Sequence, residues 1–388
     1  MILSRPLLLC ALLASLAVGA PSASAGKKIS PIAEHLTTLS VGGAREFRLA
    51  VVHPIFGPKL TASEHGLQAA AKLEADALGW TARRNRVELV NLQKGRTLLL
   101  PGEIVRGPRA DLSTETYVTT DANKRSSFRT RLVSDEQPSD LPKLEMRLVG
   151  ELLPPTLRWH ATHGSPKELR KELLKWTRSV DLKTARKSVL DLAPSIELKA
   201  RVGEYEKALA ATSKAPAGTA LAGYALLIDG DLAQIETFSS PKLLQAWWPR
   251  ILRSIAVECA VLETQHSLLE EEIAAGTDPD RHLKLVKERL LTLYAAKAKT
   301  SRLPGVGEQW VLELPHNTSA QSLVIDDKVA AMYITVRPDR RKVTTPDEKL
   351  DPGAISRKKR PTEAERRWLE RRKTRNPPIP PVSGPSND

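Results

Sequence analysis

The sequence predicts an α+β fold, with a strand-rich N-terminal half and helices packed on hairpins or a sheet in the C-terminal half. Residues 45–148 contain short apolar runs separated by Gly and Pro, a pattern typical of strands. The second half contains two hairpin signals and several stretches with apolar residues at helical spacing. We therefore expect an α+β fold.

The clearest hairpin signal is YALLIDGDLAQIETF, residues 224–238. Asp229-Gly230 is the pair that a tight type I′ turn favours, because both central residues need a positive φ. Residues 323–332 repeat the pattern, so we expect two similar hairpins in one sheet. On the return strand of the first hairpin, period-two alternation predicts one face formed by Leu232, Gln234, Glu236 and Phe238.

Ser-Pro pairs predict the starts of two helices, because a Ser side chain caps the first turn and Pro is tolerated at the first helical position. One helix follows Ser240-Pro241, and Pro249 is expected to kink it. Its apolar stripe includes Cys259, which we expect to be a buried thiol. The other helix follows Ser165-Pro166. A Thr-x-x-Glu capping box predicts a further helix over residues 61–73.

Residues 1–25 have the pattern of a secretory leader. A basic residue precedes an apolar region, and small residues ending in Ala-Ser-Ala follow it. We therefore expect export to the periplasm or the extracellular space, with a mature chain that begins at Gly26 and an N-terminal extension over 26–44. No later stretch is apolar enough to predict a membrane span.

The formal net charge of +14 is concentrated near the C-terminus, where residues 337–375 contain fifteen Lys or Arg against seven Asp or Glu. Residues 339–388 are also rich in Pro and poor in apolar side chains, which predicts a disordered basic tail. Such a tail favours an anionic partner, such as lipid headgroups, a cell-wall polymer or nucleic acid. A solubilising tail without a dedicated partner is the alternative.

Two segments carry a resemblance to a known bacterial family. Leu99–Gly107 reads LLPGEIVRG, and Phe238–Ala256 contains Ser-Pro, Trp-Pro and Leu-Arg-Ser at fixed spacing. Both resemble segments of the ARG and rhodanese-phosphatase-superfamily-associated protein domain, a domain of unknown function. The resemblance covers residues 45–338, with a possible subdivision near residue 160.

The name of this family implies an association with ADP-ribose or NAD metabolism, without a mechanism. This chain departs from the family pattern after Gly107, where the family's Gln-Asn-Arg group is replaced by residues 108–111, Pro-Arg-Ala-Asp. The departure implies that any binding by that group is altered or lost here.

The glycine-flanked loop around Glu103 is the best candidate for a functional site. Gly102 and Gly107 let a backbone approach a ligand, and Glu103 offers an acceptor for a hydroxyl group or a catalytic base. Arg106 and Arg109 complete the predicted ligand-binding set. The alternative is that Glu103 orients the loop.

Two histidines three residues apart, His160 and His163, lack a motif-linked third ligand. We therefore expect neither a metal site nor a cofactor. The sequence also lacks the G-x-S-x-G, H-E-x-x-H, phosphate-loop and dinucleotide motifs.

The sequence thus leads to two hypotheses. The first is a non-enzymatic envelope module that binds a ligand or a protein. The second is an enzyme or sensor for ADP-ribose-like or NAD-like phosphorylated nucleosides, with the Gly102-Glu103 loop as its site.

Overall fold

A computed structural model describes residues 30–58, 66–70, 78–83, 86–107, 110–135, 146–184, 186–210, 215, 219–266, 279–303, 305–315 and 317–337. All of them belong to one compact unit that ends at Pro338. The leader predicted at residues 1–25 and the tail predicted at 339–388 lie outside the described residues. The predicted α+β class is confirmed, with most strands of the N-terminal half preceding most of the helices.

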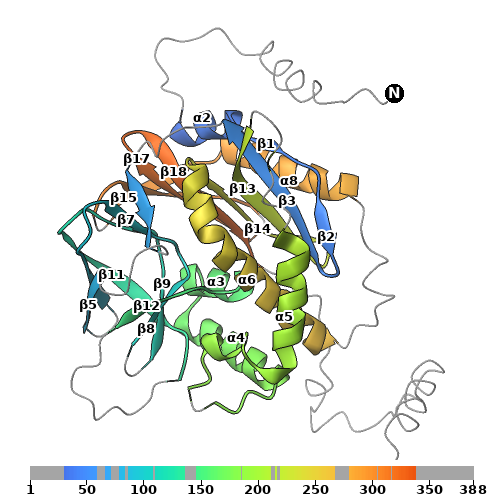
Figure 1. The fold of residues 1–388 in the computed structure, drawn as a ribbon. Coiled ribbons are helices and arrows are strands. Elements are labelled where there is room, and N and C mark those ends of the chain that lie inside the picture. The colour runs from blue at the N-terminus through green and yellow to red at the C-terminus, as the bar shows by residue number, and fades with distance from the viewer. Residues whose placement is uncertain are drawn as a thin grey trace, which may run out of the picture. The chain divides into compact units, whose positions relative to one another are not determined.

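A nine-stranded antiparallel sheet forms the centre of the described unit (Figure 1). Its strands follow the order β1-β3-β13-β14-β18-β17-β16-β15, and β2 pairs with β3 outside this path. The strands are β1 (Ser40–Val41), β2 (Arg45–Phe47), β3 (Ala50–Pro58), β13 (Thr219–Ile228), β14 (Asp231–Phe238), β15 (Ala298–Arg302), β16 (Glu308–Glu313), β17 (Thr318–Ile325) and β18 (Lys328–Val336).

Helices pack on both faces of this large sheet. One face buries apolar side chains under α3, α4, α5 and α6, and Figure 1 shows α5 and α6 in front of the sheet. The other face packs against α2 and α8. The described helices are α2 (Pro31–Thr37), α3 (Pro155–Thr162), α4 (Pro166–Ser179), the 3₁₀ turn η4 (Val189–Asp191), α5 (Ile196–Leu209), α6 (Pro241–His266) and α8 (Pro279–Tyr294). None of these helices is long and apolar enough to cross a membrane.

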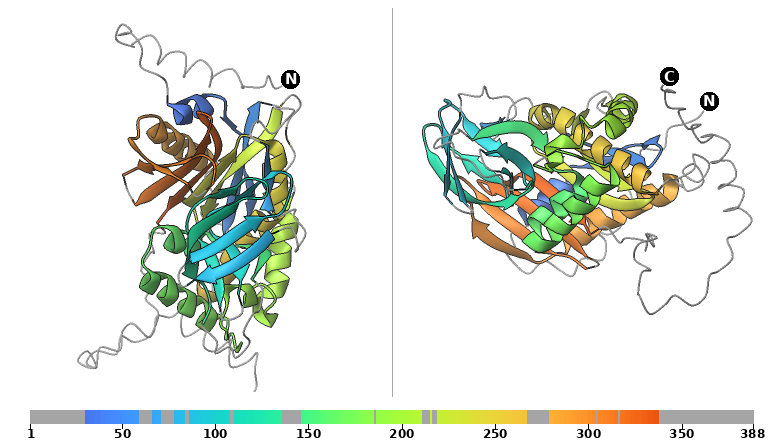
Figure 2. Two further views of the ribbon diagram at one scale, coloured as in Figure 1. Left: turned by 90° about the vertical axis from the view of Figure 1, so that its left-hand side faces the viewer. Right: turned by 90° about the horizontal axis from the view of Figure 1, so that it is seen from below.

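A smaller β unit stands to one side of the large sheet, in blue-green in Figure 2. It contains a six-stranded sheet, β12-β8-β9-β11-β6-β5, and a three-stranded sheet, β10-β7-β4, with a separate apolar core. Its strands are β4 (Leu67–Ala69), β5 (Leu78–Arg83), β6 (Arg86–Asn91), β7 (Arg96–Leu99), β8 (Glu103–Arg106), β9 (Asp111–Thr114), β10 (Val118–Thr120), β11 (Arg125–Leu132) and β12 (Arg147–Leu152).

Strand β4 corrects the helix predicted over residues 61–73. Leu67 and Ala69 are buried while Gln68 between them is exposed, which is the alternation of a strand, and β4 pairs in parallel with β7. Over the described residues 66–70, the long-range pairing with β7 is therefore what the structure shows in place of a helix. The rest of the predicted helix, apart from Gly66 and Ala70, lies outside the described residues.

Both predicted hairpins are confirmed. Asp229 and Gly230 have φ values of 52° and 77°, and Asp326 and Asp327 have φ values of 50° and 60°. Strand β14 pairs with β18, so the two hairpins are neighbours in one sheet. The predicted position of Leu232 is wrong, because a bulge shifts the register after Leu226 and places Leu232 on the face of α2 and α8.

The predicted starts of α4 and α6 are confirmed. Ser165 caps α4 in a capping box with Glu168, and α6 begins at Pro241 and runs through Pro249. Cys259 is fully buried on α6, as expected, and burial raises the pKa of its thiol well above the usual value. A buried protonated thiol is a packing group rather than a reactive one.

Candidate functional site

Glu103, the central residue of the predicted site, is fully buried at the start of β8. Its Oε1 accepts a hydrogen bond from Arg250 Nη1 of α6 at 3.2 Å, and its Oε2 accepts one from the backbone N–H of Leu100 at 3.2 Å. Burial raises the pKa of Glu103 to about 8, although Arg250 acts to lower it. The carboxyl group therefore connects the loop before β8 to α6.

Gly102 lets a side chain rather than a ligand approach the backbone. Its φ is +84°, and a Cβ atom there would lie 2.5 Å from Cγ of Arg158. Arg158 Nε donates to the carbonyl oxygen of Pro101 at 2.5 Å. Arg158 thus fills the space that Gly102 leaves, and the loop is packed from inside the protein.

The structure does not bring the rest of the predicted ligand-binding set to Glu103. Arg106 Nε and Nη2 donate to the two carboxylate oxygens of Asp111, at 3.0 and 3.2 Å. Gly107 makes a backbone hydrogen bond to Ala110 at 2.9 Å. Arg109 lies outside the described residues.

Arg158 and Glu236 form an ion pair inside the protein. Both side chains are at most 1 % exposed, and Arg158 Nη2 and Nη1 lie 2.8 and 3.2 Å from the two carboxylate oxygens. The guanidinium carbon lies 3.9 Å from the ring centre of Tyr333, and the Tyr224 hydroxyl donates to Glu236 at 2.9 Å. Burial acts to lower the pKa of Arg158, but Glu236, Tyr333 and Tyr224 together more than offset this, and the net shift is upward.

Glu258 is the third buried carboxyl group of this region. It accepts a hydrogen bond from the backbone N–H of Thr156 at 2.7 Å and a second one from the Thr156 hydroxyl group. The N-cap of α3, Pro154, offers no side-chain acceptor, so α6 supplies one for the first turn of α3. Burial raises the pKa of Glu258 to about 7, against the lowering effect of the Thr156 hydrogen bonds.

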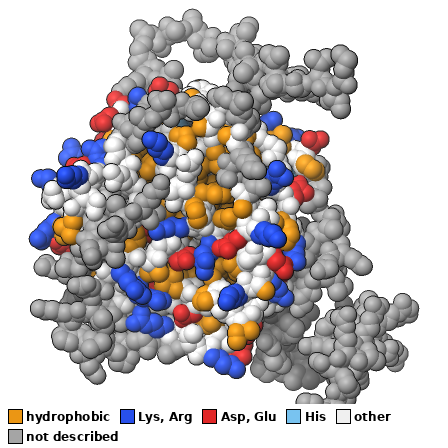
Figure 3. All heavy atoms as spheres, viewed as in Figure 1, with side chains coloured by type: hydrophobic (Ala, Val, Ile, Leu, Met, Phe, Trp, Pro, Cys, Tyr) orange, Lys and Arg blue, Asp and Glu red, His pale blue; other side chains and the backbone are white. Residues whose placement is uncertain are grey.

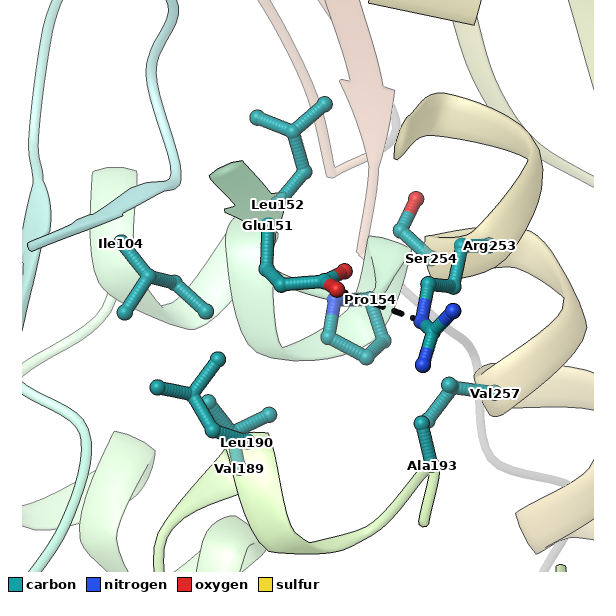
Figure 4. A pocket seen from close by; sticks show the side chains of 10 residues that line it. All are labelled: Ile104, Glu151, Leu152, Pro154, Val189, Leu190, Ala193, Arg253, Ser254 and Val257. Carbon is teal, nitrogen blue, oxygen red and sulfur yellow. Dashed lines mark ion pairs between the residues drawn. The ribbon is translucent and has the colours of Figure 1, made fainter. Parts of the chain in front are cut away.

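A pocket opens beside these buried groups, between β8, β12, η4 and α6 (Figure 4). Its empty space, including the part open to solvent, is about 340 Å³. Glu151, Arg253 and Ser254 provide its polar side chains. The apolar lining consists of Ile104, Leu152, Pro154, Val189, Leu190, Ala193 and Val257.

An ion pair lies at the polar side of the pocket. Arg253 Nε is 3.2 Å from Glu151 Oε1, and Arg253 Nη1 is 3.8 Å from Glu206. The side chains of Arg253 and Glu151 are 41 % and 30 % exposed. Burial raises the pKa of Glu151, while Arg253 and Arg250 act to lower it. Figure 3 shows acidic and basic side chains mixed across the face of the molecule that is turned to the viewer in Figure 1.

His160 and His163 do not form a metal site with other described residues. In the part of the chain that the structure describes, no group of three or more His, Cys, Asp or Glu side chains could hold a metal ion. His163 instead contacts Ser319 and Gln321 of β17. It lies at the C-terminal end of α3, away from Pro154 and the pocket.

Sequence reasoning missed Arg158, Arg250 and the pocket. One signal for Arg158 was present, because Glu236 was placed on the same strand face as Phe238. A carboxylate on a buried face requires a buried cation or several hydrogen-bond donors. That requirement predicts a partner, but it does not identify which of the many basic residues supplies it.

These features define an α+β protein with a small amphipathic pocket beside buried ion pairs. The family model of the ARG and Rhodanese-Phosphatase-superfamily-associated Protein domain matches residues 174–335. This match agrees with the resemblance of the Phe238–Ala256 segment to the same family. The Leu99–Gly107 segment lies before the matched residues. No curated protein and no solved structure matches the chain.

Proposed function

We propose that this protein is an exported binding module that holds a small amphipathic molecule in the pocket between β8, β12, η4 and α6. One observation carries the proposal: the two segments that resemble the family meet at this pocket. Ile104 of the first segment and Arg253 and Ser254 of the second line it. Glu103 and Arg250 join the same two segments in an ion pair.

The lining indicates the chemistry of the ligand. Val189, Leu190 and Val257 offer an apolar surface, and Arg253 offers a guanidinium group at the open side. The Arg253 side chain is 41 % exposed, and its ion pairs with Glu151 and Glu206 are 3.2 and 3.8 Å long. Exposed pairs of this kind contribute little to stability, so a carboxylate of the ligand can compete for the guanidinium group. A small carboxylic acid with an apolar body fits this arrangement.

Export and attachment belong to the same proposal and rest on the sequence. The leader pattern of residues 1–25 supports export to the periplasm or the extracellular space. The basic segment 339–388 supports attachment to an anionic surface, through lipid headgroups, a cell-wall polymer or nucleic acid.

The ADP-ribose or NAD-like alternative keeps its support from the family resemblance alone. This hypothesis requires Glu103 to contact the ligand, whereas Glu103 is fully buried and paired with Arg250.

A thermal-shift screen tests the proposal with small carboxylic acids, their amides and matched amines. A ligand present at about one hundred times its Kd stabilises the fold by roughly 2.7 kcal/mol, which gives a visible rise in Tm. We expect acids with an apolar body to raise Tm and their amides to have a smaller effect.

Two matched variants locate the binding. Ala193→Phe fills the pocket and should abolish the shift, whereas Ala200→Phe adds the same ring at an exposed position of α5 and should leave it unchanged. A shift that survives Ala193→Phe, or no shift with any acid at millimolar concentration, would show that the pocket does not bind this class.

A further inference from the structure

A chain of hydrogen bonds at the C-terminal end of α3 links a serine to a histidine. Ser319 Oγ of β17 lies 2.6 Å from His163 Nε2, and His163 Nδ1 lies 2.7 Å from Thr162 Oγ1. The Thr162 hydroxyl donates to the backbone carbonyl of Arg158 at 2.8 Å. Two hydroxyl groups, from Thr162 of α3 and Ser319 of β17, thus contact the two nitrogens of one histidine ring.

The direction of each hydrogen bond in this chain follows from the donors available. The single hydroxyl proton of Thr162 is used on the helix carbonyl, so Thr162 Oγ1 accepts a hydrogen bond from His163 Nδ1. A neutral imidazole with its proton on Nδ1 has a lone pair on Nε2. Ser319 Oγ–H therefore donates to Nε2, which is the arrangement of a nucleophile and its general base.

Two glutamines place an N–H donor beside the same ring nitrogen. Gln309 Nε2 donates to Gln321 Oε1 at 3.0 Å, which fixes the orientation of the Gln321 amide. Gln321 Nε2 consequently donates to His163 Nε2 at 3.3 Å and shares the lone pair of that nitrogen with the Ser319 hydroxyl group. Both glutamines are buried, at 6 % and 3 % exposure, so the donor is held in place before any substrate arrives.

We propose that Ser319 is a nucleophile for acyl transfer from carboxylic esters, with His163 as its general base and Gln321 as a donor to the developing oxyanion. Thr162 is a positioning residue that holds His163 in the required tautomer. This inference goes beyond the proposed function and does not rest on it, because the pocket adjoins Pro154 at the opposite end of α3.

The reaction balances with water as the second substrate. Ser319 Oγ attacks the ester carbonyl carbon and its proton moves to His163 Nε2. The carbon–oxygen bond to the leaving alcohol then breaks, and the imidazolium gives its proton to that oxygen. A water molecule, deprotonated by His163, hydrolyses the acyl-serine and releases the acid, while the proton returns to Ser319.

The surroundings of His163 indicate which esters are preferred. The Trp159 ring centre lies 6.0 Å from the His163 ring, and the guanidinium carbon of Arg337 lies 5.2 Å from the Trp159 ring centre. Arg337 is half exposed, and its ion pair with Glu168 is long, at 3.9 Å. An exposed pair of this kind contributes little to stability, so an anionic group of a substrate can replace Glu168. Small esters with an anionic acyl group fit best.

Labelling of the full-length protein with a fluorophosphonate probe, followed by peptide mass spectrometry, tests the nucleophile. We expect one adduct, on Ser319, that is absent from Ser319→Ala. His163→Gln should slow labelling by about 10²-fold or more, the usual contribution of a general base. Thr162→Val should also slow it, and Thr162→Ser should restore it, because only the hydroxyl group is needed.

Ser301 of β15 is the matched control, since it is an exposed strand serine. Ser301→Ala should label like the wild type. No adduct on Ser319, or labelling of Ser319 at an unchanged rate in His163→Gln, would overturn the proposal. A Tm measurement for each variant confirms that the folded protein is compared.

Substrate preference is tested with two 4-nitrophenyl esters, the acetate and the singly charged hydrogen succinate. We expect faster release of 4-nitrophenolate from the succinate, and loss of that preference in Arg337→Gln. Equal rates in the wild type would overturn the assignment of an anionic acyl group, whatever the labelling shows.

Discussion

The two ends of α3 differ in the kind of polar group that they bury. At the N-terminal end, Glu236, Glu103 and Glu258 are fully or nearly fully buried, and each is satisfied by Arg158, Arg250 or the first turn of the helix. At the C-terminal end, Ser319, His163 and Gln321 form a chain of neutral groups, of which Ser319 and His163 are half-buried and Gln321 is buried. The same short helix is thus held by an ion pair and hydrogen bonds to buried carboxyl groups at one end, and by hydrogen bonds between neutral side chains at the other.

The difference teaches how each end is expected to respond to change. A buried charge that loses its partner has no water to replace it, so removal of one partner is strongly destabilising. A neutral hydrogen bond near the surface contributes about 1 kcal/mol, and water can replace a missing partner. The buried ion pair at the N-terminal end of α3 therefore stabilises the fold. At the C-terminal end, the hydroxyl proton of Ser319 is able to move to His163.

The largest effect is expected for Arg158→Ala. This change leaves Glu236 buried without its cation and should lower the free energy of unfolding by about 3–5 kcal/mol. Urea unfolding followed by circular dichroism measures it. Arg337→Ala removes an exposed cation from the other end and should cost less than about 1 kcal/mol. Equal losses for the two variants would remove the distinction between the ends.

An intermediate, pH-dependent effect is expected for Glu258→Gln. The pKa of Glu258 is raised from 4.5 to about 7, so between these values the folded state binds more protons than the unfolded state. The contribution of this group to stability then falls as pH rises through that window. Gln resembles the protonated form. The free energy of unfolding of the variant, relative to that of the wild type, should therefore rise by up to about 3 kcal/mol between pH 5 and pH 8. Urea unfolding at several pH values measures the gain, and a difference that does not change with pH would contradict it.

The smallest effect on stability is expected for Ser319→Ala. It removes one hydroxyl group from the neutral chain and should lower the free energy of unfolding by about 1 kcal/mol or less. The same variant should nevertheless lose all fluorophosphonate labelling. A loss of stability comparable to that of Arg158→Ala would show that Ser319 serves the fold rather than a reaction.

Local chemistry explains which parts of this fold the sequence predicted. Asp229-Gly230 and Ser165-Pro166 carry their turn and cap signals within a few residues, and both features are confirmed. The face of the sheet on which Leu232 lies depends on a bulge, and the formation of β4 depends on its pairing with β7. Neither feature has a signature within its own segment.

The site was harder to predict, because its contacts join residues far apart in the chain. Glu103 was singled out, but its partner Arg250 lies 147 residues away. Ser319 and His163 are separated by 156 residues, and His163 was considered only with its neighbour His160. Residue type and spacing suggested which groups carry chemistry, while the fold decided which of them meet.

The position of β3 in the large sheet has a consequence for the boundaries of the family domain. Residues 174–335 match the family model, yet β3 lies between β1 and β13, and Arg158 belongs to α3, before the matched residues. A fragment cut at those limits would expose the ten-residue edge of β13 and leave Glu236 without its cation. Bare strand edges of this length promote aggregation. The segment that matches the family model is therefore shorter than the segment that folds. A protein fragment limited to residues 174–335 is not expected to form the folded unit.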